Sequence, residues 1–126
     1  MIMDPNAADQ LTEGVRENDV GMWKISCRLA SCLNQIAAED YSEIAARMKE
    51  SAMAMPDKMT SLILCTKEPD FHEMREDLRA LVAENNYLLN FFYREGVIGQ
   101  EMYCTAIKFL SHLEGYLHSL AFRDLR

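Results

Sequence analysis

Residues 51–62 read SAMAMPDKMTSL, a run of helix-forming residues that contains a proline, Pro56. A proline in a helix interior removes one backbone hydrogen bond and costs about 3 kcal/mol. The residues Ser51, Ala52 and Ala54 on its N-terminal side are small, so a neighbouring helix can approach closely there. We therefore predict a long helix that continues through Pro56 and is kinked at this residue.

Three further segments carry apolar residues at helical spacing. The first helix is predicted from about Val20 to Ala37, and the second, which contains Pro56, continues to about Thr66. The third follows Pro69 and ends before Gly96, and the fourth follows Gly99. Short connections between long helices force neighbours to run antiparallel. The sequence therefore predicts an all-α fold, an antiparallel up-down-up-down four-helix bundle.

Local signals predict where these helices begin and end. Asp40 with Glu43, and Asp70 with Glu73, have the spacing of a capping box, in which the first residue caps the helix. Gly96 is expected just past the end of the third helix, in the left-handed conformation.

Asn85 is a polar residue within the apolar seam of the third helix. Two interpretations stay open. It lies at the boundary of the core and bonds to a neighbour, or it is buried and disfavours mismatched helix pairings at a cost in stability.

Length and charge define the domain organisation and the expected compartment. Residues 1–19 contain five acidic residues and one arginine, and we expect residues 1–18 to form a mobile acidic arm before a bundle domain at 19–126. We find no apolar run long enough for a membrane span and no signal-peptide pattern at the N-terminus. We therefore expect a cytoplasmic protein with no membrane partner.

The net charge of −7 bears on possible partners. Residues 68–77 add a second acidic segment, and no stripe of lysine and arginine is present. Because nucleic-acid binding depends on clustered positive charge, this composition argues against a nucleic-acid partner.

Motifs for catalysis or metal binding are missing from the sequence. No glutamate is followed three residues later by histidine, as di-iron bundles require. The spacing of Cys27 and Cys32 does not match structural zinc sites. We expect Cys27, Cys32, Cys65 and Cys104 to be reduced and mostly buried. The prediction is a protein with no catalytic residues, no metal and no cofactor; a metal-dependent enzyme is the disfavoured alternative.

Four stretches together resemble a known family. They are VGMWKISCRLA (20–30), ARMKESAMAMPDKM (46–59), LRALVAENNYLLNFFYREGVI (78–98) and EMYCTAIKFLSHLEGYLHSL (101–120). The chain resembles the four-helix-bundle proteins encoded in intervening sequences of 23S ribosomal-RNA genes, which are relatives of the accessory variability proteins of diversity-generating retroelements. The resemblance implies a left-handed bundle that assembles as a homopentamer and has no known catalytic activity.

Apolar residues beyond one stripe per helix indicate an interface, because a single bundle buries about one stripe of each helix. We predict self-association through aromatic residues of the third and fourth helices: Phe91, Phe92, Tyr93, Phe109, Tyr116 and Phe122. The expected function is a non-enzymatic oligomeric scaffold or adaptor, which binds itself and in addition another protein. The alternative is a retroelement accessory protein that binds nucleic acid and a reverse transcriptase. The resemblance implies that such accessory proteins are basic, whereas this chain is acidic.

Overall fold

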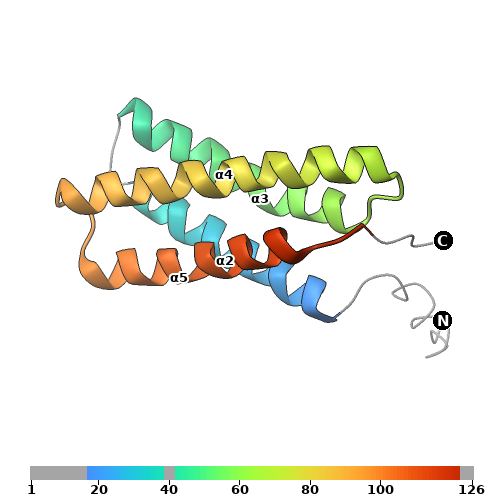
Figure 1. The fold of residues 1–126 in the computed structure, drawn as a ribbon. Coiled ribbons are helices and arrows are strands. Elements are labelled where there is room, and N and C mark those ends of the chain that lie inside the picture. The colour runs from blue at the N-terminus through green and yellow to red at the C-terminus, as the bar shows by residue number, and fades with distance from the viewer. Residues whose placement is uncertain (1–16, 39–41, 123–126) are drawn as a thin grey trace, which may run out of the picture.

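The computed structural model describes residues 17–38 and 42–122, and this part of the chain is all-helical with no strand. It contains α2 (Glu17–Ala38), α3 (Glu43–Ile63), α4 (Glu68–Arg94) and α5 (Gln100–Ser119), shown in Figure 1. The prediction of an all-α fold with four helices is confirmed. Since α2 begins at Glu17, the helix includes the last two residues of the predicted acidic arm. The rest of that arm lies outside the described residues.

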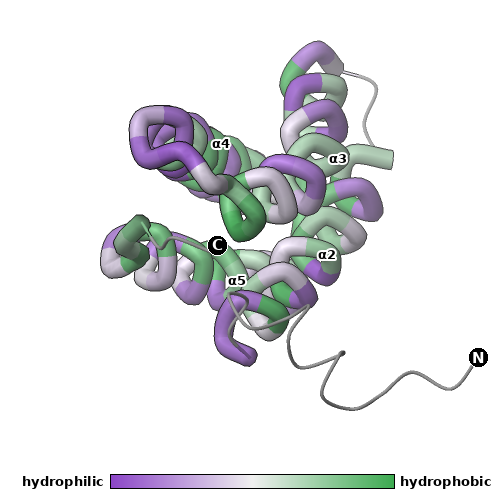
Figure 2. Tube along the Cα trace, turned by 90° about the vertical axis from the view of Figure 1, so that its right-hand side faces the viewer, coloured by the Kyte–Doolittle hydropathy of each residue, from purple (hydrophilic) through white to green (hydrophobic). Residues whose placement is uncertain are grey.

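Each helix packs against two others. α2 contacts α3 and α5, and α4 also contacts α3 and α5, so the helices occupy four corners around one core, as Figure 2 shows. In Figure 1 the chain colour runs in opposite directions along consecutive helices. None of the four helices is long and apolar enough to cross a membrane.

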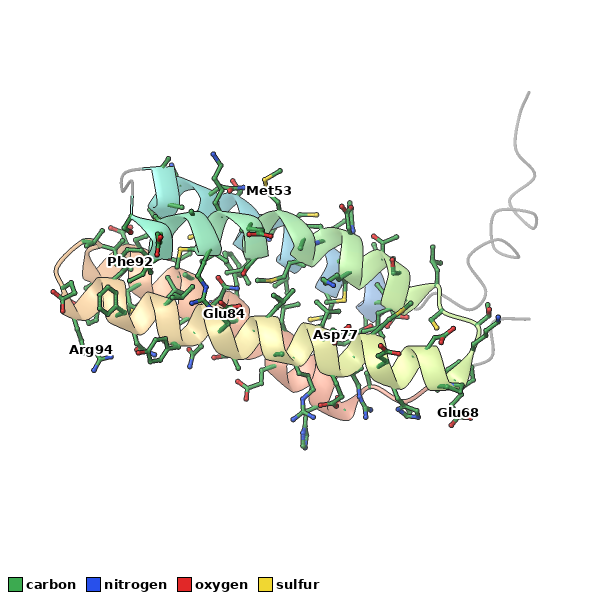
Figure 3. All side chains as sticks on the ribbon, turned by 90° about the horizontal axis from the view of Figure 1, so that it is seen from above. Met53, Glu68, Asp77, Glu84, Phe92 and Arg94 are labelled. Atoms are coloured by element: carbon green, nitrogen blue, oxygen red, sulfur yellow. The ribbon has the colours of Figure 1, made fainter. Side chains whose placement is uncertain are left out.

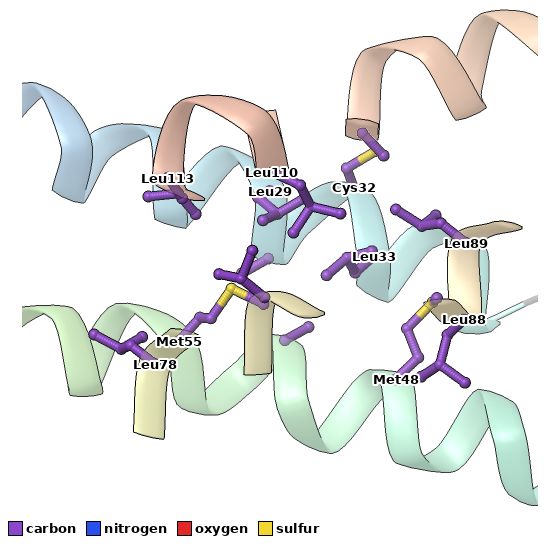
Figure 4. Packing of buried hydrophobic residues seen from close by; sticks show 14 of the residues in the cluster. Leu29, Cys32, Leu33, Met48, Met55, Leu78, Leu88, Leu89, Leu110 and Leu113 are labelled. Atoms are coloured by element: carbon purple, nitrogen blue, oxygen red, sulfur yellow. The ribbon is translucent and has the colours of Figure 1, made fainter. Parts of the chain in front are cut away.

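The core is built from one stripe of each helix. Its largest fully buried side chains are leucines, methionines and one phenylalanine, some of which appear in Figure 4: Leu29, Leu33, Met48, Met55, Met59, Leu62, Leu78, Leu89, Phe92, Leu110, Leu113 and Leu117. Burying a side chain of this size stabilises the fold by about 1.5–3 kcal/mol. The burial of these side chains therefore holds the four helices together around one core.

The helix α3 is continuous through Pro56, which is half-buried. The Thr60 hydroxyl donates a hydrogen bond to the carbonyl oxygen of Pro56 at 3.0 Å. Since proline has no N–H, the carbonyl oxygen of Ala52 cannot accept its usual helical hydrogen bond from residue 56. Packing of the buried methionines on both sides of Pro56 offsets this loss.

Helix ends differ from the predictions at two of three places. Ser42, not Asp40, caps α3, because its hydroxyl accepts a hydrogen bond from the Ala45 N–H at 3.2 Å; Asp40 lies outside the described residues. The cap of α4 is Lys67, without a side-chain hydrogen bond, so Asp70 lies inside the first turn. In this position the Asp70 carboxylate still stabilises the helix, because it lies near the positive N-terminal end of the helix dipole. The prediction for Gly96 is confirmed, since its φ is +75°.

Polar contacts join the ends of different helices. The Tyr116 hydroxyl near the end of α5 donates to Asp19 Oδ1 at the start of α2, at 2.6 Å, and both residues are buried. The Arg75 guanidinium donates from α4 to the carbonyl oxygen of Leu120 at 2.9 Å, just past the end of α5. A hydrogen-bonded ion pair of Arg47 with Glu84 links α3 to α4. These contacts oppose sliding of the helices past one another along their axes.

Asn85 is fully buried, which excludes the boundary interpretation. Its side-chain N–H donates to the Leu81 carbonyl oxygen of the same helix at 2.9 Å, and its Oδ1 has no hydrogen-bond partner in the described part of the chain. A buried amide oxygen without a hydrogen-bond partner lowers stability. This cost is expected if Asn85 disfavours mismatched helix pairings.

We expect Tyr116→Phe to lower the free energy of unfolding by about 1.5–3 kcal/mol, because it removes a buried hydrogen bond to a carboxylate. Urea unfolding followed by circular dichroism measures this change. The matched control is Tyr87→Phe, at a tyrosine that is 65% exposed, for which we expect a change within about 0.5 kcal/mol. Equal stability of the two variants would show that the Tyr116–Asp19 contact does not stabilise the fold.

Candidate functional site

An apolar surface lies on α2 and α3 and is not covered by the other helices. Its exposed members are Val20 and Trp23 from the first turns of α2, Met53 from α3, and Leu64, the residue that caps the C-terminal end of α3. Trp23 is 39% exposed, Leu64 55% and Met53 63%. We call these four residues the α2–α3 surface. Large apolar side chains gathered on one side of a protein mark an interaction site more often than single exposed ones do.

Helical spacing explains why these residues share a side of each helix. Met53 and Thr60 of α3 are seven residues apart, and Leu64, the C-cap of α3, follows Thr60 by four residues, which places the three along one side. On α2, Val20 and Trp23 are three residues apart and also share a face. The buried stripe of α3, with Met55 and Met59, points elsewhere, so Met53 cannot enter the core.

A pocket of about 280 Å³ lies where the two helices meet. It is lined by Val20, Trp23, Thr60, Ile63 and Leu64, none of which is charged. The Ser26 hydroxyl, which is fully buried, donates a hydrogen bond to the Trp23 carbonyl oxygen at 2.6 Å. This bond stabilises the helical turn that carries the Trp23 side chain.

Two other hollows of the described surface are lined by charged residues. Between α4 and α5 a groove of about 420 Å³ is lined in part by Glu76, Arg79 and Glu114. Between α3 and α4, Arg47, Glu50, Lys58 and Glu84 line a hollow of about 310 Å³. The α2–α3 pocket therefore differs from them in chemistry, although it is not the largest.

Most of the aromatic residues predicted as the interface pack within the chain itself. Phe92 is 1% exposed, and Tyr116 is buried against Asp19, so for these two the interface prediction is wrong. Phe91 and Phe109 are half-buried against the core.

Two aromatics of the predicted interface pack against single rings. Phe122 is half-buried and makes an edge contact with Phe71, with ring centroids 5.6 Å apart. Tyr93 is exposed but stacks on Tyr103 of α5, at 4.3 Å between centroids. Of the six residues, Tyr93 alone is exposed, at 38%, and one face of its ring is already covered by Tyr103.

Histidine and acidic residues do not converge. His72 is exposed, with its Nε2 3.6 Å from Glu68 Oε1 of its own helix, while His112 and His118 are exposed on α5. Within residues 17–38 and 42–122, no three His, Cys, Asp or Glu side chains are grouped so that they could hold a metal ion.

The four cysteines are free, and Cys32 is the one among them that is buried. The prediction that they are mostly buried is wrong, because Cys104 is exposed and Cys27 and Cys65 are half-buried. Cys32 lies in the core with its Sγ 3.5 Å from Met102 Sδ. Burial raises the pKa of the Cys32 thiol above its ordinary value, because a thiolate is poorly solvated there.

Comparison with known proteins adds no relative: the sequence matches no protein-family model, and neither the curated proteins nor the solved structures contain a significant match. The resemblance to the intervening-sequence proteins therefore stays a prediction.

We expect the cysteines to differ in reactivity. Since the thiolate is the reactive form and the pKa of Cys32 is raised, iodoacetamide at mildly alkaline pH should label Cys32 at least about tenfold more slowly than Cys104. Peptide mass spectrometry after timed labelling of the folded protein measures both rates. The unfolded protein in urea is the control, in which the two rates should converge. Comparable rates in the folded state would contradict the burial of Cys32.

Proposed function

We propose that this protein is a self-associating four-helix bundle that acts as an oligomeric scaffold or adaptor and has no enzymatic activity. The observation that carries the proposal is the α2–α3 surface, where Trp23, Met53 and Leu64 remain exposed in a single copy. Removing apolar area from water contributes about 25 cal/mol per Å², so covering this surface favours association.

The finer features of the fold belong to the same proposal. The contact of Asp19 with Tyr116 joins the first turn of α2 to the last turns of α5, which supports an antiparallel up-down-up-down arrangement. The missing N–H of Pro56 supports a kink in α3. From the resemblance we take a left-handed bundle and a homopentamer as the favoured assembly, in the cytoplasm.

Charge weighs against the alternative, a retroelement accessory protein that binds nucleic acid. The chain has a net charge of −7, and three of its arginines are engaged in ion pairs, Arg47 with Glu84 and both Arg75 and Arg79 with Glu76. A phosphate backbone would have to compete with these carboxylates.

Native mass tests the proposal directly. Light scattering on a size-exclusion column, at micromolar concentration, should give a single species above the 14.5 kDa of one chain, with five times that mass expected for the pentamer. A clean monomer over the whole accessible concentration range would overturn the scaffold proposal.

A further inference from the structure

We infer that the outer side of the α2–α5 pair is a docking site for an acidic segment of a partner protein. Four exposed side chains form this site, two from each helix, and we call them the α2–α5 basic face: Lys24, Arg28, Lys108 and His112. The inference goes beyond the proposed self-association, because it assigns a second surface and states the chemistry of the partner that an adaptor would bind there.

A contact inside the bundle shows which side of α2 faces α5. Cys32 of α2 lies against Met102 of α5, with 3.5 Å between their sulfur atoms. Arg28 and Lys24 lie four and eight residues before Cys32, so they follow the same side of α2. Since both are exposed, they lie at the outer edge of the seam between the two helices.

A second contact does the same for α5. Tyr116 of α5 donates its hydrogen bond to Asp19 of α2. His112 and Lys108 lie four and eight residues before Tyr116, and both are exposed. They therefore follow the side of α5 that faces α2, and the basic side chains of the two helices border one seam.

The two pairs are also level with each other. Moving four residues along each helix from the contact of Cys32 with Met102 leads to Arg28 on α2 and to Ala106 on α5, two residues from Lys108. Each pair spans four residues, a rise of about 6 Å, and packed helices are about 8–10 Å apart. The four side chains thus emerge from one small area of the surface.

This area is free of acidic residues, although the chain has a net charge of −7. The facing stretches, residues 21–31 of α2 and 102–113 of α5, contain no aspartate or glutamate. Acidic residues are most frequent on α4, where Figure 3 labels Glu68, Asp77 and Glu84. Among the described helices, α4 contacts α3 and α5 but not α2. The positive charge of the α2–α5 basic face is therefore not cancelled within the two stretches that carry it.

The cations of this face are available to a partner. In the described part of the chain, no ion pair is formed by Lys24, Arg28 or Lys108. Phe109 lies seven residues before Tyr116 and is half-buried, so part of an aromatic ring lies beside the charges on the same side of α5. A partner segment can contact apolar and charged groups there together.

Charge and spacing identify the partner as an acidic protein segment. In an extended chain, side chains on one face recur about every 7 Å, which matches the rise of about 6 Å between Lys24 and Arg28. A nucleic acid carries a negative charge at every phosphate. The net charge of −7 therefore repels it more strongly than it repels a short acidic peptide.

The test is binding of a fluorescein-labelled peptide of ten glutamates to the full chain, measured by fluorescence anisotropy at low salt. We expect Arg28→Glu to raise the Kd about tenfold, because an attraction is replaced by a repulsion. Arg28→Gln, which removes the charge without reversing it, should raise the Kd less. The matched control is Lys49→Glu, the same charge change at an exposed residue of α3, which should alter the Kd less than about twofold. Circular dichroism checks that each variant keeps its helical content.

Three results would overturn the inference. They are a wild type that does not bind the peptide at millimolar concentration, equal weakening by Lys49→Glu and Arg28→Glu, and tighter binding of a ten-nucleotide thymidylate than of the peptide. The last result would assign the face to nucleic acid.

Light scattering on the same samples separates this inference from the proposed function. An unchanged native mass for Arg28→Glu together with weaker peptide binding supports the docking site. Dissociation of an oligomer by Arg28→Glu overturns it, because the face would then be a contact between copies. A monomeric wild type that binds the peptide through Arg28 overturns self-association and supports the docking site.

Discussion

A helix in a four-helix bundle can bury only one stripe of its surface, and this limit decides which apolar residues of the chain remain exposed. In α3 the buried stripe is taken by Met48, Met55 and Met59, so Met53 is left outside although it has the same side chain. In α2 the stripe that contains Leu29 and Leu33 leaves Val20 and Trp23 at the edge. The exposed apolar surface is thus a consequence of how the core is filled.

The same limit links the fold to the proposed function. Because the hollows beside α4 are lined by charged residues such as Arg79 and Glu84, they stay compatible with water without a partner. The α2–α3 pocket is uncharged and gains free energy when it is covered. Under the proposed function the protein works by bringing copies of itself together, and the position of the uncovered apolar surface then decides how the copies meet.

Local sequence patterns were sufficient to predict the four helices, the end of α4 shortly before Gly96 and the continuation of α3 through Pro56. The interface prediction failed for Phe92, which follows the buried Leu78 and Asn85 at seven-residue spacing and therefore belongs to the core stripe of α4. It failed for Tyr116 because this residue is buried against Asp19 of another helix. The burial of Asp19 with Tyr116 depends on residues far apart in the sequence, and no local pattern signals it. The exposure of Met53 had a detectable signal: it lies off the spacing shared by Met48, Met55 and Met59.

The central claim is that the α2–α3 surface becomes covered when copies associate, and Trp23, the only tryptophan of the chain, reports on it directly. The measurement is acrylamide quenching of tryptophan fluorescence over a range of protein concentrations that spans dissociation and assembly. The account predicts that quenching weakens and the emission shifts to shorter wavelength as the oligomer forms, because the indole leaves water. Quenching that stays constant while the native mass rises would contradict it, since the copies would then be meeting through another surface.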